Sequence, residues 1–197
     1  MKNLTEYHHL LVDKRIMTSK PSDSVVRNNI CWSPPPSNFL KLNVDAHLSD
    51  DGRWAFGMIL RRDDGRCVGA ETRICLGTHD AAMAEATGLL EALYWVDQNH
   101  LSNTIIEIDA ANIVHALNQR VFPRTDWGQV ARTGARVLAR LNDVSVTWVN
   151  RKGNEAAHEL ARWALVEPNR SWTNCFPMCI LTHIQKDMGY VTLLPSS

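Results

Sequence analysis

Apolar and polar residues alternate with a period of two along three stretches in the first half of the chain. This alternation is typical of β-strands that turn one face to a core. In the first stretch, Leu40, Leu42 and Val44 fall on one face and polar residues fall on the other. Turns with an Asp-Gly pair separate the stretches, which favours hairpin connections. The pattern predicts an antiparallel meander of three strands, over residues 39–45, 54–62 and 67–76.

After residue 79 the spacing changes to the three- and four-residue intervals that mark one face of a helix. Leu89, Leu93 and Val96 form such a face, and a short apolar strand, two helices, a strand and a last helix follow. This order indicates an α/β fold with five strands. The predicted helices cover residues 80–99, 110–119, 125–141 and 154–166, and the two later strands cover residues 105–109 and 144–148.

The two ends of the chain differ from this regular middle part. Residues 1–31 are mostly polar without a sustained period, so we expect a mobile leader or linker with a short helix near residues 7–16. Three prolines at 34–36 make the next segment extended, and a domain over residues 32–166 is expected to begin there. Residues 167–197 carry enough large apolar side chains to predict a tail that packs on this domain.

Composition and charge narrow the classes of protein. The 197 residues contain 21 Lys and Arg against 21 Asp and Glu, which argues against a polycation that grips nucleic acid by bulk charge. No stretch approaches the roughly 20 apolar residues of a membrane span, and residues 1–20 lack the apolar core of a secretory signal. With five cysteines, an odd number, we expect reduced thiols and an intracellular protein of nucleus or cytoplasm.

Three carboxylates stand where the pattern calls for buried positions. Asp45 and Asp109 end two predicted strands, and Glu85 shares the helical face of Leu89 and Val96, so it faces the sheet. A core-facing acid costs several kcal/mol, of the order of 2–7, unless something neutralises it. The three acids at element ends are placed to share a divalent cation such as Mg²⁺, which prefers oxygen ligands. Strand-end aspartates also serve as caps and turn formers, which is the plainer alternative for each one alone.

Other chemistries receive less support. Cys175, Cys179 and His183 have the four-residue spacing of a helical metal site, but Pro177 interrupts an early helix and only three zinc ligands are present. The glycines are scattered, without the spacing of a phosphate-binding loop or dinucleotide fingerprint. No nucleophile-elbow motif supports a serine hydrolase.

The element order and the acids resemble the ribonuclease H fold, in particular the ribonuclease H-like domains of plant non-LTR retroelement reverse transcriptases. The resemblance covers roughly residues 32–166, as a free-standing or truncated version, and implies a mixed sheet of three antiparallel and then two parallel strands flanked by helices. The segments that carry it are Trp32-Ser33-Pro34-Pro35, Leu40-Lys41-Leu42-Asn43-Val44-Asp45-Ala46, Gly57-Met58-Ile59-Leu60-Arg61-Arg62-Asp63-Asp64-Gly65, Ala84-Glu85-Ala86, Ile106-Glu107-Ile108-Asp109-Ala110 and Arg151-Lys152-Gly153-Asn154-Glu155-Ala156-Ala157-His158-Glu159-Leu160-Ala161.

The resemblance implies cleavage of the RNA strand of an RNA–DNA hybrid with two Mg²⁺ ions, for which Mn²⁺ is a substitute. Asp45 would bridge the ions, and Glu85 and Asp109 would complete the leaving-group site. The fourth acid of the family's pattern is replaced by His158, four residues after Asn154. Imidazole is a poorer ligand for Mg²⁺ than a carboxylate, so this site should hold metal more weakly. His158 would then act as a general base or proton shuttle, or be an ordinary histidine at a helix border.

Several polar residues are candidates for contact with nucleic acid. A stripe of arginines with four-residue spacing on one helix is expected to meet backbone phosphates, with an ordinary solvated face as the alternative. The loop after the last predicted strand carries two more cations but lacks the mobile histidine that several ribonucleases H have there. Two asparagines near the acids are candidates for the RNA 2′-hydroxyl. The candidates are Arg132, Arg136 and Arg140 in the stripe, Arg151 and Lys152 in the loop, and Asn43 and Asn112 near the acids.

These observations lead to a first hypothesis of a monomeric, metal-dependent ribonuclease H-type endonuclease with an RNA–DNA hybrid or other nucleic acid as partner and no membrane association. A nucleic-acid-binding module whose catalysis has weakened is the alternative, because His158 replaces an acid. A retroelement fragment with no selected role is the third. Retention of the three acids favours the enzyme, and function has to be decided at the site rather than from the fold.

Overall fold

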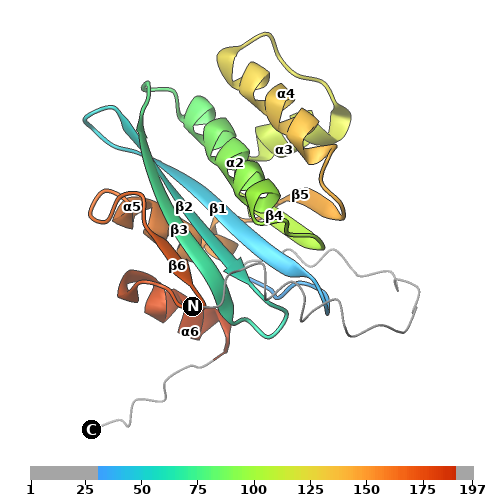
Figure 1. Cartoon of the computed structure of the whole chain (residues 1–197). Helices are drawn as coiled ribbons and strands as arrows, with labels where there is room; N and C mark the ends of the chain where they lie inside the picture. Colours follow the sequence, from blue (N-terminus) through green and yellow to red (C-terminus); the bar gives the residue numbers. More distant parts are fainter. Residues whose placement is uncertain (1–30, 190–197) are drawn as a thin grey trace, which may run out of the picture.

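A computed structural model of the chain describes residues 31–189, and its centre is one six-stranded sheet (Figure 1). The strands lie in the order β5-β4-β1-β2-β3-β6. Strands β1, β2 and β3 pair antiparallel, and β4 and β5 continue the sheet parallel to β1. The strands are β1 (Leu40–Leu48), β2 (Arg53–Arg61), β3 (Cys67–Leu76), β4 (Thr104–Ile108), β5 (Val144–Trp148) and β6 (Ser171–Thr173).

The predicted mixed α/β sheet flanked by helices is confirmed, with one correction to the number of strands. The sixth strand, β6, comes from the segment expected to be a packing tail, and it pairs antiparallel with the edge strand β3. Three residues are too few to show an alternation, so the pattern could not distinguish this strand from a loop. The first strand also runs on to Leu48, which places Asp45 inside β1 rather than at its end.

Helices cover both faces of the sheet. Figure 1 shows α2, α3 and α4 on one side and α5 and α6 on the other. The larger part of the core lies under α2–α4 and includes Leu42, Leu93 and Ile106, and a second part under α5 and α6 includes Ile59 and Leu160. The helices are α2 (Ala81–Gln98), α3 (Ala111–Gln119), α4 (Asp126–Leu138), α5 (Glu155–Trp163) and α6 (Leu181–Asp187), with short 3-10 turns η1 (Arg151–Gly153) and η2 (Met178–Ile180).

Because both faces are covered, the polar face of β1 is buried as thoroughly as its apolar face. Lys41, Asn43 and Asp45 are each at most 4% exposed. Buried polar groups need partners, so these three side chains must be paired by neighbouring elements. The central strand therefore carries both the core of the domain and the polar residues of a site.

Helix α5 lies directly on β2 at Gly57, which is the residue opposite Asp45 in the sheet. A Cβ at position 57 would come 2.3 Å from the backbone nitrogen of Ala161 and 2.4 Å from the carbonyl oxygen of Ala157. The missing side chain thus permits a close approach of helix and strand. This approach determines how near the residues of α5 come to Asp45.

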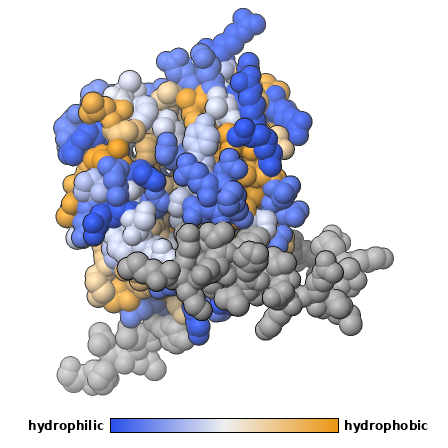
Figure 2. Space-filling model, in the orientation of Figure 1, coloured by the Kyte–Doolittle hydropathy of each residue, from blue (hydrophilic) through white to orange (hydrophobic). Residues whose placement is uncertain are grey.

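The segment after α5 is part of the same folded unit. Ile180 and Ile184 are buried against α5 and β2, and Trp172 and Phe176 pack beside them. No helix among residues 31–189 is long and apolar enough to cross a membrane. On the face shown in Figure 2, hydrophilic and apolar residues are interspersed. The helix predicted near residues 7–16 lies outside the described residues, as do the leader up to residue 30 and residues 190–197.

Candidate metal centre

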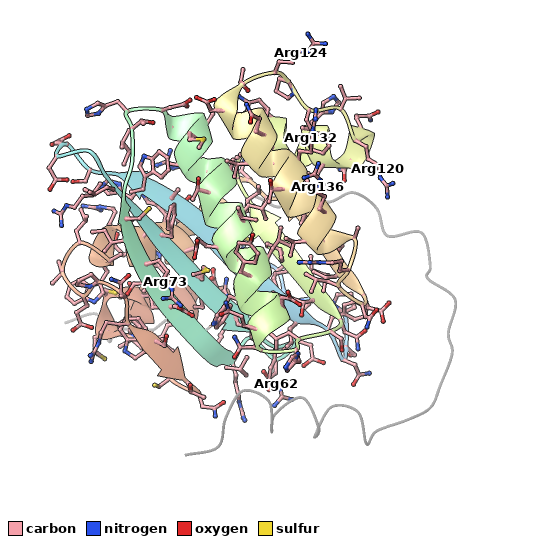
Figure 3. The ribbon with its side chains drawn as sticks, turned by 45° about the horizontal axis from the view of Figure 1, so that its top comes forward. Arg62, Arg73, Arg120, Arg124, Arg132 and Arg136 are labelled. Atoms are coloured by element: carbon pink, nitrogen blue, oxygen red, sulfur yellow. The ribbon has the colours of Figure 1, made fainter. Side chains whose placement is uncertain are left out.

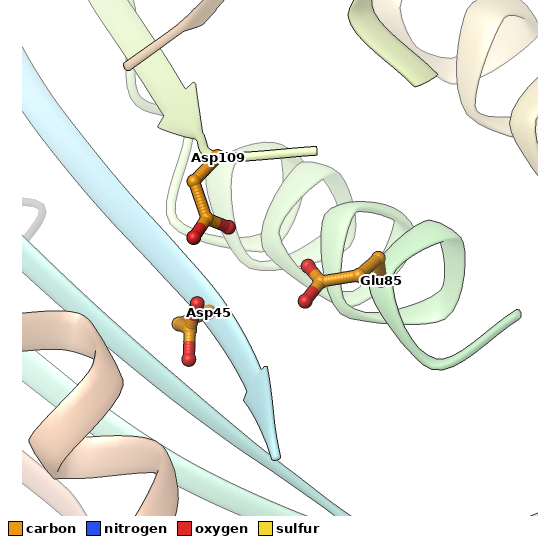
Figure 4. Close-up of side chains that lie close together, drawn as sticks. All are labelled: Asp45, Glu85 and Asp109. Carbon is orange, nitrogen blue, oxygen red and sulfur yellow. The ribbon is translucent and has the colours of Figure 1, made fainter. Parts of the chain in front are cut away.

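Three acids from three separate elements meet at one edge of the sheet (Figure 4). Asp45 comes from β1, Glu85 from the first turns of α2, and Asp109 directly follows β4. One carboxylate oxygen of each lies within 4.8 Å of the others. Among the described residues this is the one group of three or more His, Cys, Asp or Glu side chains close enough to hold a metal ion.

The topology explains why these acids meet. Strands β1 and β4 are parallel neighbours, so their carboxyl ends lie at the same edge of the sheet. They pair only as far as Asn43, so Asp45 and Asp109 stand where the two strands have parted. Asp80 caps α2 by accepting from the backbone N–H groups of Ala82 and Met83, and this directs the first turns of α2, with Glu85, to the same edge.

The acids are unfavourable neighbours without a cation. Burial, and then the charges of Asp45 and Asp109, raise the pKa of Glu85 to about 9. Burial and the charge of Asp45 also raise the pKa of Asp109. Arg151 opposes both shifts but does not cancel them. A set of hard carboxylate oxygens with excess negative charge fits a divalent cation such as Mg²⁺ or Mn²⁺.

This charge cluster predicts how metal and pH affect stability. Since folding raises the pKa of Glu85 from 4.5 to about 9, the folded state binds the proton more tightly, and metal-free protein should lose stability as pH rises through that window. At about pH 8, Glu85→Gln should therefore stabilise the metal-free protein by roughly 1–2 kcal/mol, discounted for partial exposure, with little effect at about pH 5. The midpoint of thermal unfolding in EDTA, at both pH values, measures this.

The same experiment with Mg²⁺ tests whether the cluster holds the ion. Mg²⁺ should raise the unfolding temperature of the natural chain, because a ligand that binds the folded state stabilises it. The increase should disappear in Glu85→Gln and persist in Glu91→Gln, a matched change on the same helix. An equal increase in all three proteins would rule out Glu85 as a ligand.

His158 lies beside the cluster, on α5. Its Nδ1 is 2.8 Å from Oδ2 of Asp45, and its Nε2 is 3.5 Å from a guanidinium nitrogen of Arg151. The hydrogen bond to Asp45 raises the pKa of His158, against the opposing effect of burial. The residue at the substituted fourth position is thus held by an acid of the cluster, and the second oxygen of Asp45 is left for a cation.

The two cations of the loop before α5 differ in their surroundings. Arg151 is close enough to lower the pKa values of Glu85 and Asp109, so its charge acts on the whole cluster. Lys152 is exposed, and its backbone N–H donates to the side chain of Asn150. Both occur in the 3-10 turn η1, and the guanidinium of Arg151 lies at the side of the cluster next to His158.

The two candidate asparagines are placed differently. Asn112 is exposed at the start of α3, three residues after Asp109. Asn43 is completely buried, and its side-chain amide is engaged by Trp32, Arg61, Glu107 and Asn154. A fully buried and fully paired amide has no surface to offer to RNA, so the expectation for Asn43 is corrected.

The arginine stripe is only partly retained. Arg132 and Arg136 are exposed on α4, whereas Arg140 lies beyond the end of this helix and approaches Asp97 at 3.9 Å. Figure 3 shows Arg120 and Arg124 on the same side as Arg132 and Arg136. A hollow of about 400 Å³ lies between α3 and α4, with Arg120, Arg132 and Arg136 among its lining residues. The positive charge therefore comes from Arg132 and Arg136 along α4 and from Arg120 at the end of α3.

One exposed aromatic residue near the site was missed. Trp148 ends β5, is 52% exposed, and donates from Nε1 to the backbone carbonyl of Asp109 over 3.2 Å. Val144, Val146 and Trp148 alternate along the strand, and of the three only Val146 is buried. A parallel strand at the edge of a sheet has less cover, and its edge position was the signal that could have identified Trp148.

Cys175, Cys179 and His183 are not brought together as a metal-binding group in the part of the chain that the structure describes.

The sheet is mixed and has this strand order, and an acid triad lies where β1 and β4 part. A residue of helix α5 contacts the central aspartate. Together these features define a ribonuclease H-like domain. The chain belongs to the reverse transcriptase-like family, whose model matches residues 43–164. The resemblance to ribonuclease H is thus confirmed. No curated protein matches the chain.

Solved structures agree with this assignment. Ribonuclease H1 of the halophilic archaeon Halobacterium salinarum NRC-1 is 25% identical, with a TM-score of 0.58 over 65% of this chain and 98% of that chain. The N-terminal ribonuclease H domain of Rv2228c from Mycobacterium tuberculosis is 17% identical, with a TM-score of 0.56 over 65% and 94%. LC11-RNase H1 in complex with an RNA/DNA hybrid is 16% identical, with a TM-score of 0.56 over 65% and 97%. The last two show the fold alone.

Proposed function

We propose that this protein is a metal-dependent endonuclease that cleaves the RNA strand of RNA–DNA hybrids. The observation that carries the proposal is the triad of Asp45, Glu85 and Asp109, with oxygens within 4.8 Å of one another at the parting of two parallel strands. Membership of the reverse transcriptase-like family and the similarity to a ribonuclease H1 support it.

The triad of Asp45, Glu85 and Asp109 would hold Mg²⁺, or Mn²⁺, and His158 lies beside it through its hydrogen bond to Asp45. Bound divalent cations supply activation of water and neutralisation of the leaving oxygen. A neutral His158 that donates from Nδ1 to Asp45 keeps a lone pair on Nε2, which faces a guanidinium nitrogen of Arg151 over 3.5 Å and would accept a proton from the attacking water once that guanidinium turns to the phosphate. The water oxygen bonds to phosphorus, the bond to the RNA 3′ oxygen breaks, and Arg151 beside His158 is placed to hold the phosphate.

Contacts farther from the reacting phosphate would come from exposed residues. Lys152 beside Arg151, and Arg132 and Arg136 around the hollow between α3 and α4, are proposed to meet the backbone of the hybrid. Asn112, exposed near Asp109, is proposed to meet an RNA 2′-hydroxyl. We propose a monomeric, intracellular protein of the plant non-LTR retroelement type, supported by the segments around Trp32 and Asp45.

A nucleic-acid-binding module with weakened catalysis is the second candidate. The observation that favours it is the hydrogen bond of 2.8 Å between His158 and Asp45, which occupies one oxygen of the central carboxylate where the family's pattern has another acid. A weaker metal site leaves the exposed cations Lys152, Arg132 and Arg136 in place to bind the hybrid. Binding without cleavage is what this candidate predicts.

Cleavage of a labelled hybrid tests the choice between the two candidates. The full chain is given an RNA–DNA hybrid, the same sequence as duplex RNA, and duplex DNA, each with Mg²⁺ and with Mn²⁺. The proposed enzyme cuts only the RNA strand of the hybrid and only with metal. Binding of the hybrid without cleavage in either metal would leave the binding module, and failure to bind or cut would reject both.

His158→Asp tests whether the substituted position limits catalysis. We expect this variant to raise Mg²⁺-dependent cleavage by roughly tenfold or more, because a carboxylate restores a fourth acid and a better ligand for Mg²⁺. His158→Gln is the control, since it removes the imidazole without adding a charge. A loss of activity in His158→Asp as large as in His158→Gln would show that proton acceptance by the imidazole matters more to the rate than the missing fourth acid.

A further inference from the structure

Asn154 joins strand β1 to helix α5 next to the metal centre, and it is 1% exposed. Its Nδ2 donates to the backbone carbonyl of Val44 over 2.9 Å, and its own backbone carbonyl accepts from the N–H of His158 over 3.0 Å. Val44 immediately precedes Asp45, and His158 lies one turn into the helix. A single residue therefore ties the backbone beside Asp45 to the backbone of His158.

The carbonyl of Val44 needs this partner because β4 no longer supplies one. Alternate residues of a strand direct their N–H and C=O groups to the same neighbour. Leu40 donates to Asn103 at the start of β4, so Val44, four residues on, faces β4 as well. Strands β1 and β4 pair only as far as Asn43. Beyond it, the side-chain amide of Asn154 replaces β4 as the hydrogen-bond partner of β1. Asn154 thus lies where β1 and β4 separate, next to the acid triad.

The neighbours of Asn154 determine which way its amide points. The Oδ1 of Asn43 accepts from Trp32 Nε1 over 3.0 Å and from Arg61 over 2.9 Å. The Nδ2 of Asn43 must then face the other way, toward Glu107 at 3.0 Å and Asn154 at 3.2 Å. Because Oδ1 of Asn154 accepts this bond, its Nδ2 is the group that faces β1. Trp32 Nε1 and Arg61 can only donate, so they fix the orientation of the Asn43 amide. Asn43 in turn fixes the orientation of the Asn154 amide.

We propose that Asn154 is a positioning residue for the metal centre: its oriented carboxamide fixes the first turn of α5 against β1 and so sets the hydrogen bond between His158 and Asp45. The catalytic meaning of this role rests on the proposed function. The geometry itself is independent of catalysis, and it can be tested on metal-free protein.

The test measures which ring nitrogen of His158 carries the proton. The bond to Asp45 involves Nδ1, so it selects the Nδ1–H tautomer over the Nε2–H form. Histidine-labelled full chain, without metal and above the pH at which the ring titrates, reports this ratio by nitrogen NMR, and His158→Gln assigns the signal. In Asn154→Ser the ratio should fall about five- to tenfold, because serine still begins a helix but cannot reach the carbonyl of Val44.

Two controls separate positioning from general stability. Leu93→Ala weakens the core on the opposite face of the sheet by about 2–5 kcal/mol and should leave the His158 tautomer unchanged. Asn154→Ala should repeat the effect of serine, so that one folded variant of the two suffices. An unchanged tautomer in the Asn154 variants, or an equal change in Leu93→Ala, would overturn the proposal. Hybrid cleavage by the natural chain, measured separately, decides the proposed function, and the tautomer result stands whether or not cleavage is seen.

Discussion

Replacing Asp109 by asparagine is expected to reduce cleavage of an RNA–DNA hybrid by about 10³-fold or more, equivalent to about 4 kcal/mol of transition-state stabilisation. The amide keeps the shape of the side chain but removes a charge and an anionic ligand from a cluster of three. Initial rates at saturating hybrid and Mg²⁺ measure the loss. Because burial and Asp45 raise the pKa of Asp109, the variant should be at least as stable as the natural chain without metal.

The matched control is Asp143→Asn, the same chemical change at an exposed residue before β5. Asp143 has a positive φ of 55°, a conformation that asparagine also adopts readily. The activity and the unfolding temperature of the Asp143→Asn variant should equal those of the natural chain. Equal rates for Asp109→Asn and Asp143→Asn would show that any cleavage seen comes from elsewhere, such as a contaminating nuclease, and would remove the basis of the proposed activity.

Gly57→Ala is expected to have the largest effect on stability. The new Cβ would meet backbone atoms of α5 at 2.3 and 2.4 Å, and backbone cannot move aside as a flexible side chain can. The helix would have to move away from β2, at a cost of about 3 kcal/mol, which lowers the midpoint of thermal unfolding by about 6–12 °C. Since Gly57 lies opposite Asp45, the same shift should draw His158 away from Asp45 and lower activity in the protein that still folds.

Gly134→Ala makes the same change where space allows it. A Cβ there meets only one side-chain atom of Leu93, at 3.3 Å, and alanine in a helix interior is favoured over glycine by about 1 kcal/mol. The unfolding temperature of this variant should be unchanged or higher. A loss in Gly134→Ala equal to that in Gly57→Ala would mean that the close approach of α5 to β2 is not what makes Gly57 necessary.

The acids of the site could be found from the sequence because they contradict a pattern. Glu85 falls on the apolar side of a helix, so periodicity marks it as a buried charge, and Asp45 and Asp109 stand at the ends of two predicted strands. The order of the elements then brings them to one edge. The family resemblance, confirmed by the match over residues 43–164, added His158 at the fourth position.

Other features depend on contacts between distant parts of the chain and leave no local signal. Asn43 lies on the same face of β1 as Asp45 and was a candidate for contact with RNA, but α5 covers that face, which only the packing of the helix on Gly57 reveals. Trp148 alternates with Val144 and the buried Val146 but is exposed, because β5 is an edge strand. Strand β6 exists because β3 offers it an edge, not because three residues prefer to be extended.

The pairing of Arg61 with Asp187 shows how far along the chain this folded domain extends. Arg61 is 1% exposed, its guanidinium lies 3.8 Å from the ring of Trp32, and its charge is balanced by Asp187 of α6 at 2.6 Å. Losing one partner of a buried ion pair costs about 3–5 kcal/mol. Trp32 and Asp187 both lie outside the segment shared with the family, residues 43–164. A shortened chain that keeps both contacts of Arg61 must therefore span residues 32–187 and include the proline-rich segment and the last helix.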